Sequence, residues 1–199
     1  MTVILEVALE HRSVERVEGD LLVAGFFCED RPLKGAAGTA DWRLCGLVSR
    51  ILLEGECSGK EGEAILVASK GRLRIARVLL VGLGEVGRFC AESFGERTRV
   101  ATQQALELGA KRLVLEPLGI RAEDFSPHSG TLLEAVLAPL RAQQMTLELD
   151  LLIPEAERGR ADAALRKAIT KSAPGEAALV AKRVRKPLKA APSGLQQAL

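Results

Sequence analysis

Short apolar runs alternate with segments of helical periodicity along this chain. Two runs, Ala64–Ala68 and Val78–Val81, do not alternate with polar residues, which is typical of strands covered by helices on both faces. Further strands are expected at residues 3–9, 20–27, 111–116 and 147–153. We expect the strands at 3–9 and 20–27 to open the sheet as neighbours.

Apolar residues spaced three and four apart predict a helix over Leu44–Leu52. Thr39 and Asp41 are the capping residues expected at its start. The preceding segment, Cys28–Thr39, contains a proline and two glycines and is expected to be a loop. The polar segment Glu54–Gly62, with three glycines, is expected to be an exposed turn.

Three more helices are predicted downstream. One extends from Gly87 to Leu108. The next follows a polar loop, residues 119–130, and begins at a capping box formed by Thr131 and Glu134. The last reaches Lys171. This order of strands and helices predicts an α/β domain with three layers, α/β/α, over residues 1–172.

The remaining residues, 173–199, are expected to form a basic tail interrupted by proline and glycine. Its basic cluster consists of Lys182, Arg183, Arg185, Lys186 and Lys189. Such a cluster can bind nucleic-acid phosphates without sequence preference, and a solvated tail is the alternative. Because no aromatic residue lies among these positions, base stacking is not indicated.

Composition narrows the class of protein. The chain has 199 residues, of which 47% are hydrophobic and 3% aromatic, so its core consists of Leu, Val, Ala and Ile. The four cysteines form no C-x-x-C pair. Because the sequence shows no signal peptide, we expect reduced thiols and a cytoplasmic location. No apolar run approaches the roughly 20 residues needed to span a bilayer. The net charge of +2 favours no particular partner.

A glycine pattern follows the strand at 78–81. Gly82, Leu83, Gly84 and Gly87 lie in a G-x-G-x-x-G sequence, which can cradle the phosphate of a nucleotide at the start of a helix. The acid that completes a dinucleotide site lies about 20 residues further on. Here the corresponding acid is Glu116, 29 residues after Gly87. A tight turn between strand and helix is therefore the main interpretation, and small-ligand binding is the alternative.

Three segments together resemble the N-terminal domain of the M17 leucyl aminopeptidase family. They are G-L-V-S-R-I-L-L-E-G-E-C-S-G-K-E-G-E, the strand A-I-L-V-A, and R-V-L-L-V-G-L-G. The resemblance implies a macro-domain-like mixed sheet. In ligand-binding macro domains, an asparagine-containing loop that follows the second strand contacts ADP-ribose. This chain contains no asparagine, which argues against that ligand.

The resemblance also locates the family's chemistry outside this sequence. In that family a separate C-terminal domain holds two metal ions and carries an N-T-D-A-E-G-R-like segment, which is absent here. We therefore expect no catalytic residue, metal site or cofactor, and a stand-alone domain that acts in oligomerisation or partner docking. One alternative is that a separate chain supplies the catalytic aminopeptidase subunit. The other is binding of a nucleotide or ADP-ribose-like ligand at Gly82–Gly87.

Overall fold

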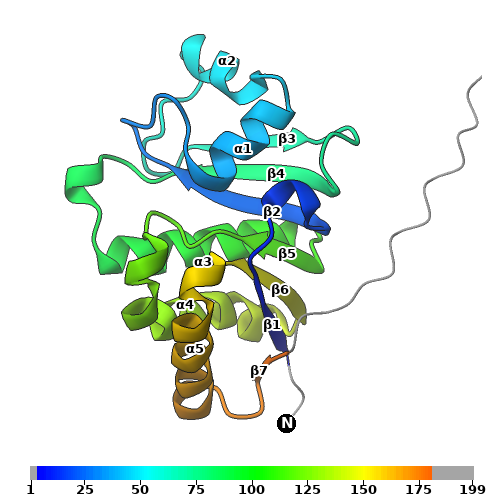
Figure 1. Ribbon diagram of the computed structural model, residues 1–199, viewed down its shortest axis with the longest axis vertical. Coiled ribbons are helices and arrows are strands. Elements are labelled where there is room, and N and C mark those ends of the chain that lie inside the picture. The colour runs from blue at the N-terminus through cyan, green and yellow to red at the C-terminus, as the bar shows by residue number, and fades with distance from the viewer. Residues whose placement is uncertain (1–3, 181–199) are drawn as a thin grey trace, which may run out of the picture.

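The computed structural model describes residues 4–180, which form a seven-stranded sheet between two layers of helices (Figure 1). The strands are β1 (Leu5–Glu10), β2 (Gly19–Phe26), β3 (Ala64–Ala68), β4 (Ile75–Gly82), β5 (Arg112–Leu115), β6 (Leu147–Leu152) and β7 (Ala177–Leu179). The α-helices are α1 (Gly35–Arg43), α2 (Leu47–Leu53), α3 (Ala91–Glu107), α4 (Phe125–Gln143) and α5 (Arg158–Ser172). Short 3₁₀ turns are η1 (Val14–Arg16), η2 (Val86–Arg88), η3 (Ala122–Asp124) and η4 (Glu155–Glu157).

The sheet is mixed, with the strand order β3-β4-β2-β5-β6-β1-β7. Its neighbouring strands are parallel, except that β3 runs antiparallel to β4. The expectation that the first two strands are neighbours was wrong, since β5 and β6 lie between β2 and β1. The short connection between β1 and β2 could join them only as an antiparallel hairpin, because parallel strands need a longer crossover. β1 pairs instead with β6 and β7, and both pairs are parallel.

Burial explains why β2 lies near the centre of the sheet. Residues 21–24 of β2 are fully buried, as expected for an apolar run with helices over both faces. The prediction that Ala64–Ala68 is likewise covered on both faces was wrong. β3 is the edge strand, and within it only Ile65 is buried.

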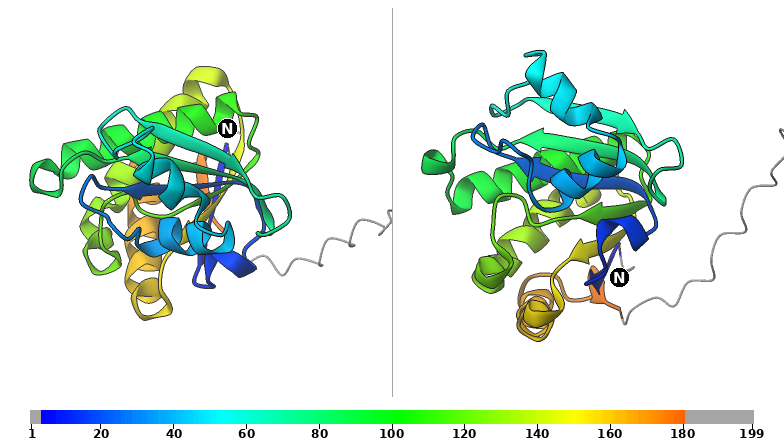
Figure 2. Two further views of the ribbon diagram at one scale, coloured as in Figure 1. Left: turned by 90° about the horizontal axis from the view of Figure 1, so that it is seen from above. Right: turned by 45° about the horizontal axis from the view of Figure 1, so that its top comes forward.

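Two apolar cores lie on opposite faces of the sheet, which gives the three layers. One core packs the sheet against α3, α4 and α5, with Phe94, Leu133 and Leu165 as members. The other packs it against α1 and α2, with Ala37 and Val48 as members. The two views in Figure 2 show the same separation of the helices. The predicted three-layer α/β/α arrangement is confirmed.

The segment before β3 contains two helices where one was expected. α1 already begins at Gly35, so Thr39 lies inside a helix and does not cap one. Cys45 and Gly46 have φ values of 60° and 72°, and these left-handed residues turn the chain into α2. Asp41 does cap α2, although it lies within α1. The sequence pattern did not reveal α1 because three of its four buried residues are alanines, which give little hydrophobic contrast, and the fourth is Asp41.

Helix α4 begins six residues before the predicted capping box, which was therefore misplaced. Phe125 is the first residue of α4 and is fully buried, and His128 lies within the helix. The helix continues through Pro139 to Gln143. Beyond α5, residues 177–179 pair with β1, so the chain contacts the sheet after residue 172 as well. Within residues 4–180, no helix has the length and apolar character that a membrane span requires.

Candidate functional site

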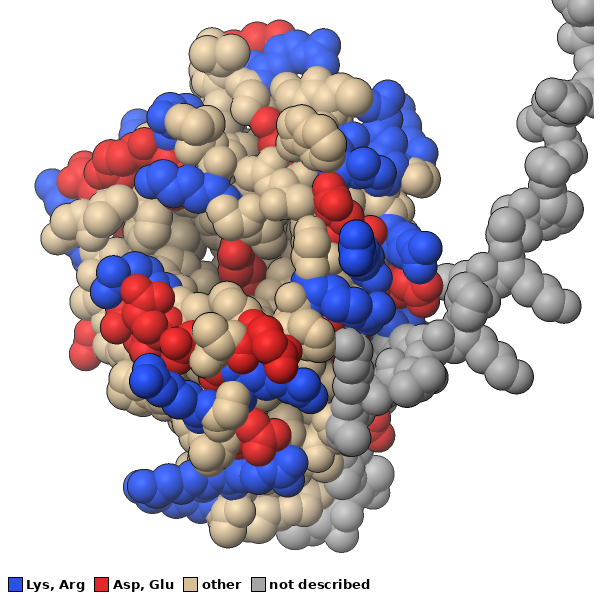
Figure 3. Space-filling model, viewed as in Figure 1, with Lys and Arg blue, Asp and Glu red and all other residues tan. Residues whose placement is uncertain are grey.

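The carboxyl ends of the parallel strands form one edge of the sheet, and a crevice is expected there. The chain leaving β2 crosses to α1 on one face, whereas the chain leaving β5 continues to α4 on the other. Such a point of divergence is where open α/β sheets usually bind ligands. Figure 3 shows a hollow in the middle of one face of the molecule, with acidic side-chain atoms inside it.

Glu116, directly after β5, occupies the start of α1. Its Oε1 accepts a hydrogen bond of 3.0 Å from the backbone N–H of Ala36. Gly35 has a φ of +55°, and a Cβ at this position would collide with the same carboxyl oxygen. Burial raises the pKa of Glu116, and the hydrogen bond from Ala36 opposes that rise. A helix N-terminus is a natural anion site, and here the chain's own carboxyl group fills it.

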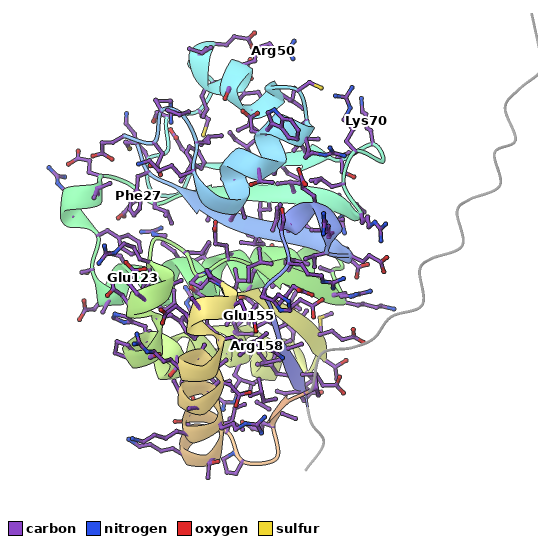
Figure 4. All side chains as sticks on the ribbon, in the orientation of Figure 1. Phe27, Arg50, Lys70, Glu123, Glu155 and Arg158 are labelled. Carbon is purple, nitrogen blue, oxygen red and sulfur yellow. The ribbon has the colours of Figure 1, made fainter. Side chains whose placement is uncertain are left out.

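A cavity of about 250 Å³ lies next to Glu116. Arg12 lines this cavity, but its backbone N–H and its guanidinium both donate to the carboxylate of Glu10. His11 also lines it, and its Nδ1 lies 3.2 Å from Oε2 of Glu155. Figure 4 labels Glu155 near the middle of this face. Arg12 and His11 thus each lie against a carboxylate of the protein, whereas Glu116 accepts from the backbone of α1.

The Gly82–Gly87 loop uses its first backbone donors inside the protein. The N–H groups of Gly82, Leu83 and Gly84 donate to backbone carbonyls of Glu63, Phe26 and Gly59, at 2.8, 3.0 and 2.9 Å. The loop does not lead straight into a helix, because η2 intervenes before α3. Gly87 lies in η2, and a Cβ added there would meet no atom within 4 Å. Ligand binding at this loop stays a prediction, and three of its four residues have structural roles.

A second potential anion site lies in the turn before β3. Successive backbone N–H groups of Ser58, Gly59 and Lys60 converge on Oε2 of Glu63, at 2.7, 2.8 and 3.1 Å. Such a nest of N–H groups commonly holds an anion. The hydrogen bond from Ser58 is the main reason that the pKa of Glu63 falls to about 2. The carboxylate of Glu63 therefore closes this site too.

Three further features concern other parts of the chain: the basic cluster, groups that could hold a metal ion, and another cavity. The basic cluster from Lys182 to Lys189 lies outside the described residues. Among residues 4–180, no group of three or more His, Cys, Asp and Glu side chains is arranged to hold a metal ion. Cys90 and His128 line one cavity of about 420 Å³, and the His128 ring packs on Phe94 with a centroid distance of 5.8 Å.

Exposed apolar side chains are the feature that the sequence analysis missed. Trp42 on α1 is 71% exposed, Leu53 on α2 is 85% exposed and Leu66 on β3 is 46% exposed. All three belong to the segment 35–68, on α1, α2 and β3. Leu53 carried a signal in the sequence, since it follows the last residue of the apolar stripe of α2 and so falls outside it.

Comparisons with known proteins agree with this architecture. The model of the cytosol aminopeptidase family, N-terminal domain, matches residues 23–140. A probable cytosol aminopeptidase of Cupriavidus metallidurans is 39% identical over 84 residues, which are 42% of this chain and 16% of that protein. The matched part thus spans about a sixth of such curated relatives.

Solved structures show the same fold. A mutant of tomato leucine aminopeptidase superposes with a TM-score of 0.62 at 19% identity, over 84% of this chain and 37% of the tomato chain. A mutant of the Oceanobacillus iheyensis macrodomain gives a TM-score of 0.63 at 12% identity, over 83% of this chain and 92% of the macrodomain. The predicted macro-domain-like sheet is confirmed. The chain belongs to the cytosol aminopeptidase family, of which it represents the N-terminal domain.

Proposed function

We propose that this domain acts in assembly and performs no catalysis itself. It docks on further copies of the chain and on the catalytic domain of a cytosol aminopeptidase. The exposure of Trp42, Leu53 and Leu66 supports this role most strongly. Large apolar side chains that are exposed on a surface can become buried in a contact with another protein. Desolvated aromatic residues such as a buried Trp provide much of the binding energy in such contacts.

Two possible anion sites at the carboxyl ends of the strands are already filled by side chains of the protein, which favours assembly over ligand binding. At the start of α1, Glu116 accepts the hydrogen bond that a phosphate would need from Ala36. In the 58–60 turn, Glu63 does the same with three N–H groups. An anionic ligand at either place would have to displace a carboxylate of the chain. The ligand's affinity would be lower, because the hydrogen bonds of that carboxylate must be broken before the ligand can bind.

The relatives suggest the class of partner. The curated proteins that match this chain are named probable cytosol aminopeptidases, and the chain matches only part of their length. A catalytic domain of this family is therefore the partner that we propose. A cytoplasmic location is part of the same proposal.

Light scattering on the full chain tests the proposal. The chain is measured over a concentration series, alone and mixed with the catalytic domain of the Cupriavidus metallidurans relative. We expect masses above the 21.3 kDa of one chain. Replacing Trp42, Leu53 and Leu66 together by serine should reduce the association, whereas Val86→Ser, at a 52% exposed residue of η2, should leave it unchanged. A mass of one chain throughout, with no complex in the mixture, would overturn the proposal.

A further inference from the structure

The edge strand β3 has backbone groups that point away from the sheet. Its register with β4 pairs Ile65 with Leu80 and Val67 with Val78. Just beyond its ends, Ser69 donates to the carbonyl of Ala76, and the carbonyl of Glu63 accepts from Gly82. Because hydrogen-bonded positions alternate in an antiparallel ladder, the odd-numbered residues face β4. The N–H and C=O groups of Ala64, Leu66 and Ala68 therefore point outward.

This outer edge is open and lacks the usual protection. Ala64, Leu66 and Ala68 are exposed. Figure 1 shows β3 as the last strand at its end of the sheet, as the strand order requires. Natural edge strands are usually blunted by a charge, a proline or a bulge. The strand sequence A-I-L-V-A contains neither a charge nor a proline.

The two segments that flank β3 have opposite charge. Residues 54–63, before the strand, contain four glutamates and one lysine. Residues 69–74, after it, contain one lysine and two arginines and no acid. Figure 4 labels Lys70 in this basic turn. If two copies of β3 lie antiparallel, the acidic segment of each copy lies beside the basic turn of the other. A parallel arrangement would instead bring like charges together.

We propose that a second copy of this chain pairs with β3, so that the two strands lie antiparallel about a two-fold axis and the two sheets become continuous. Leu66 lies opposite the partner's Leu66, and Ala64 lies opposite the partner's Ala68, each pair exchanging both backbone hydrogen bonds. The two-fold axis makes the pairing self-complementary, since the same three outward residues of each copy take part, and it brings each acidic flank beside a basic one. The inference rests on the proposed role in assembly and names one surface and one partner for it.

Leu66→Pro tests the strand pairing directly. Proline removes the outward N–H of residue 66, whereas the bonds between β3 and β4 come from the neighbouring residues and remain. Leu66→Thr is the matched control, because it shortens the apolar side chain and keeps the N–H. Sedimentation equilibrium of the full chain should show dimerisation at least about tenfold weaker for Leu66→Pro than for Leu66→Thr. Thermal unfolding at low concentration verifies that both variants are folded.

Charge exchange tests the orientation. Glu61→Lys and Lys70→Glu should each weaken self-association, because each makes the facing segments alike in charge. An equimolar mixture of the two should associate again, because each reversed residue then faces its opposite. Glu61 also pairs with Arg97 at 2.6 Å, so Glu61→Gln serves as the control for losing that pair without reversing the charge.

The outcomes separate this inference from the proposed function. The β3 pairing is wrong if Leu66→Pro dimerises as well as the unmodified chain, or if the mixture of charge variants fails to restore association. In either case the proposed role in assembly is not contradicted. If the chain is monomeric alone but binds the catalytic domain, the same conclusion follows. If the chain associates with neither, both are wrong.

Discussion

The junction of α1 and α2 gives the sharpest prediction about stability. Asp41 is 7% exposed, and its Oδ1 accepts hydrogen bonds from the backbone N–H groups of Val48 and Ser49 at 2.8 and 3.1 Å. Its Oδ2 accepts from the hydroxyl of Ser49. One buried carboxylate on α1 thus supplies the N-terminal cap of α2. Asp41→Ala removes all three hydrogen bonds at once.

The expected loss follows from these contacts. Loss of a helix cap costs about 0.5–2 kcal/mol. The substitution also leaves the N–H of Val48 without an acceptor, and because Val48 is fully buried, water does not replace the lost one. This adds about 1–3 kcal/mol. The two effects overlap, so we expect a loss of about 2–3 kcal/mol in the free energy of unfolding, or roughly 4–12 °C in Tm for a domain of this size.

Denaturant and thermal unfolding at neutral pH measure this loss. Asp41→Asn keeps one acceptor oxygen and should lose less than Asp41→Ala. Ser49→Ala removes only the hydroxyl bond and should lose least. In the double variant Asp41→Ala, Ser49→Ala, the two losses should not add, because they share a contact. A loss for Asp41→Ala no larger than that for Ser49→Ala would refute the assigned capping role.

Two further predictions concern the turn before β3 and the loop after β4. The pKa of Glu63 is lowered to about 2 in the folded protein. The contribution of its carboxylate to stability is therefore complete above the ordinary pKa of 4.5 and is lost as the pH falls towards 2. Glu63→Gln should reduce stability at neutral pH and flatten this acid dependence, as measured by urea unfolding across pH. A Cβ at residue 82 would collide with the carbonyl oxygen of Lys60, whereas none of the surrounding atoms lies near one at residue 87. Gly82→Ala should therefore cost about 1–3 kcal/mol and Gly87→Ala no more than about 0.5 kcal/mol by the same assay, and equal effects would contradict the assigned roles.

Local patterns were sufficient to predict six of the seven strands and the layered architecture, whereas β7 lies in the segment that was expected to be a tail. The apolar runs of β4, β5 and β6 were located correctly, because strands buried between helices need unbroken apolar sequences. The strand order could not be predicted this way, since the pairing of β1 with β6 joins residues far apart in the chain. Helix α1 was missed because alanines pack closely without marking an apolar stripe.

The candidate site was harder to predict than the fold. The glycines at 82–87 were visible in the sequence, but the carbonyls that receive their N–H groups come from Phe26, Gly59 and Glu63, on other segments. The bond between Glu116 and Ala36 spans 80 residues. No local pattern reports such a contact. Edge exposure of β3 was equally hidden, because A-I-L-V-A resembles a buried strand until its position in the sheet is known.

Amide hydrogen exchange, resolved by residue, tests most directly whether this domain works through the β3 edge and not through the crevice. The chain is compared at low and at high protein concentration, and again with ADP-ribose added. We predict that high concentration slows exchange at Ala64, Leu66 and Ala68, and that ADP-ribose leaves Ala36 unchanged. Slower exchange at Ala36 with ADP-ribose, with no concentration dependence at the edge strand, would contradict the account.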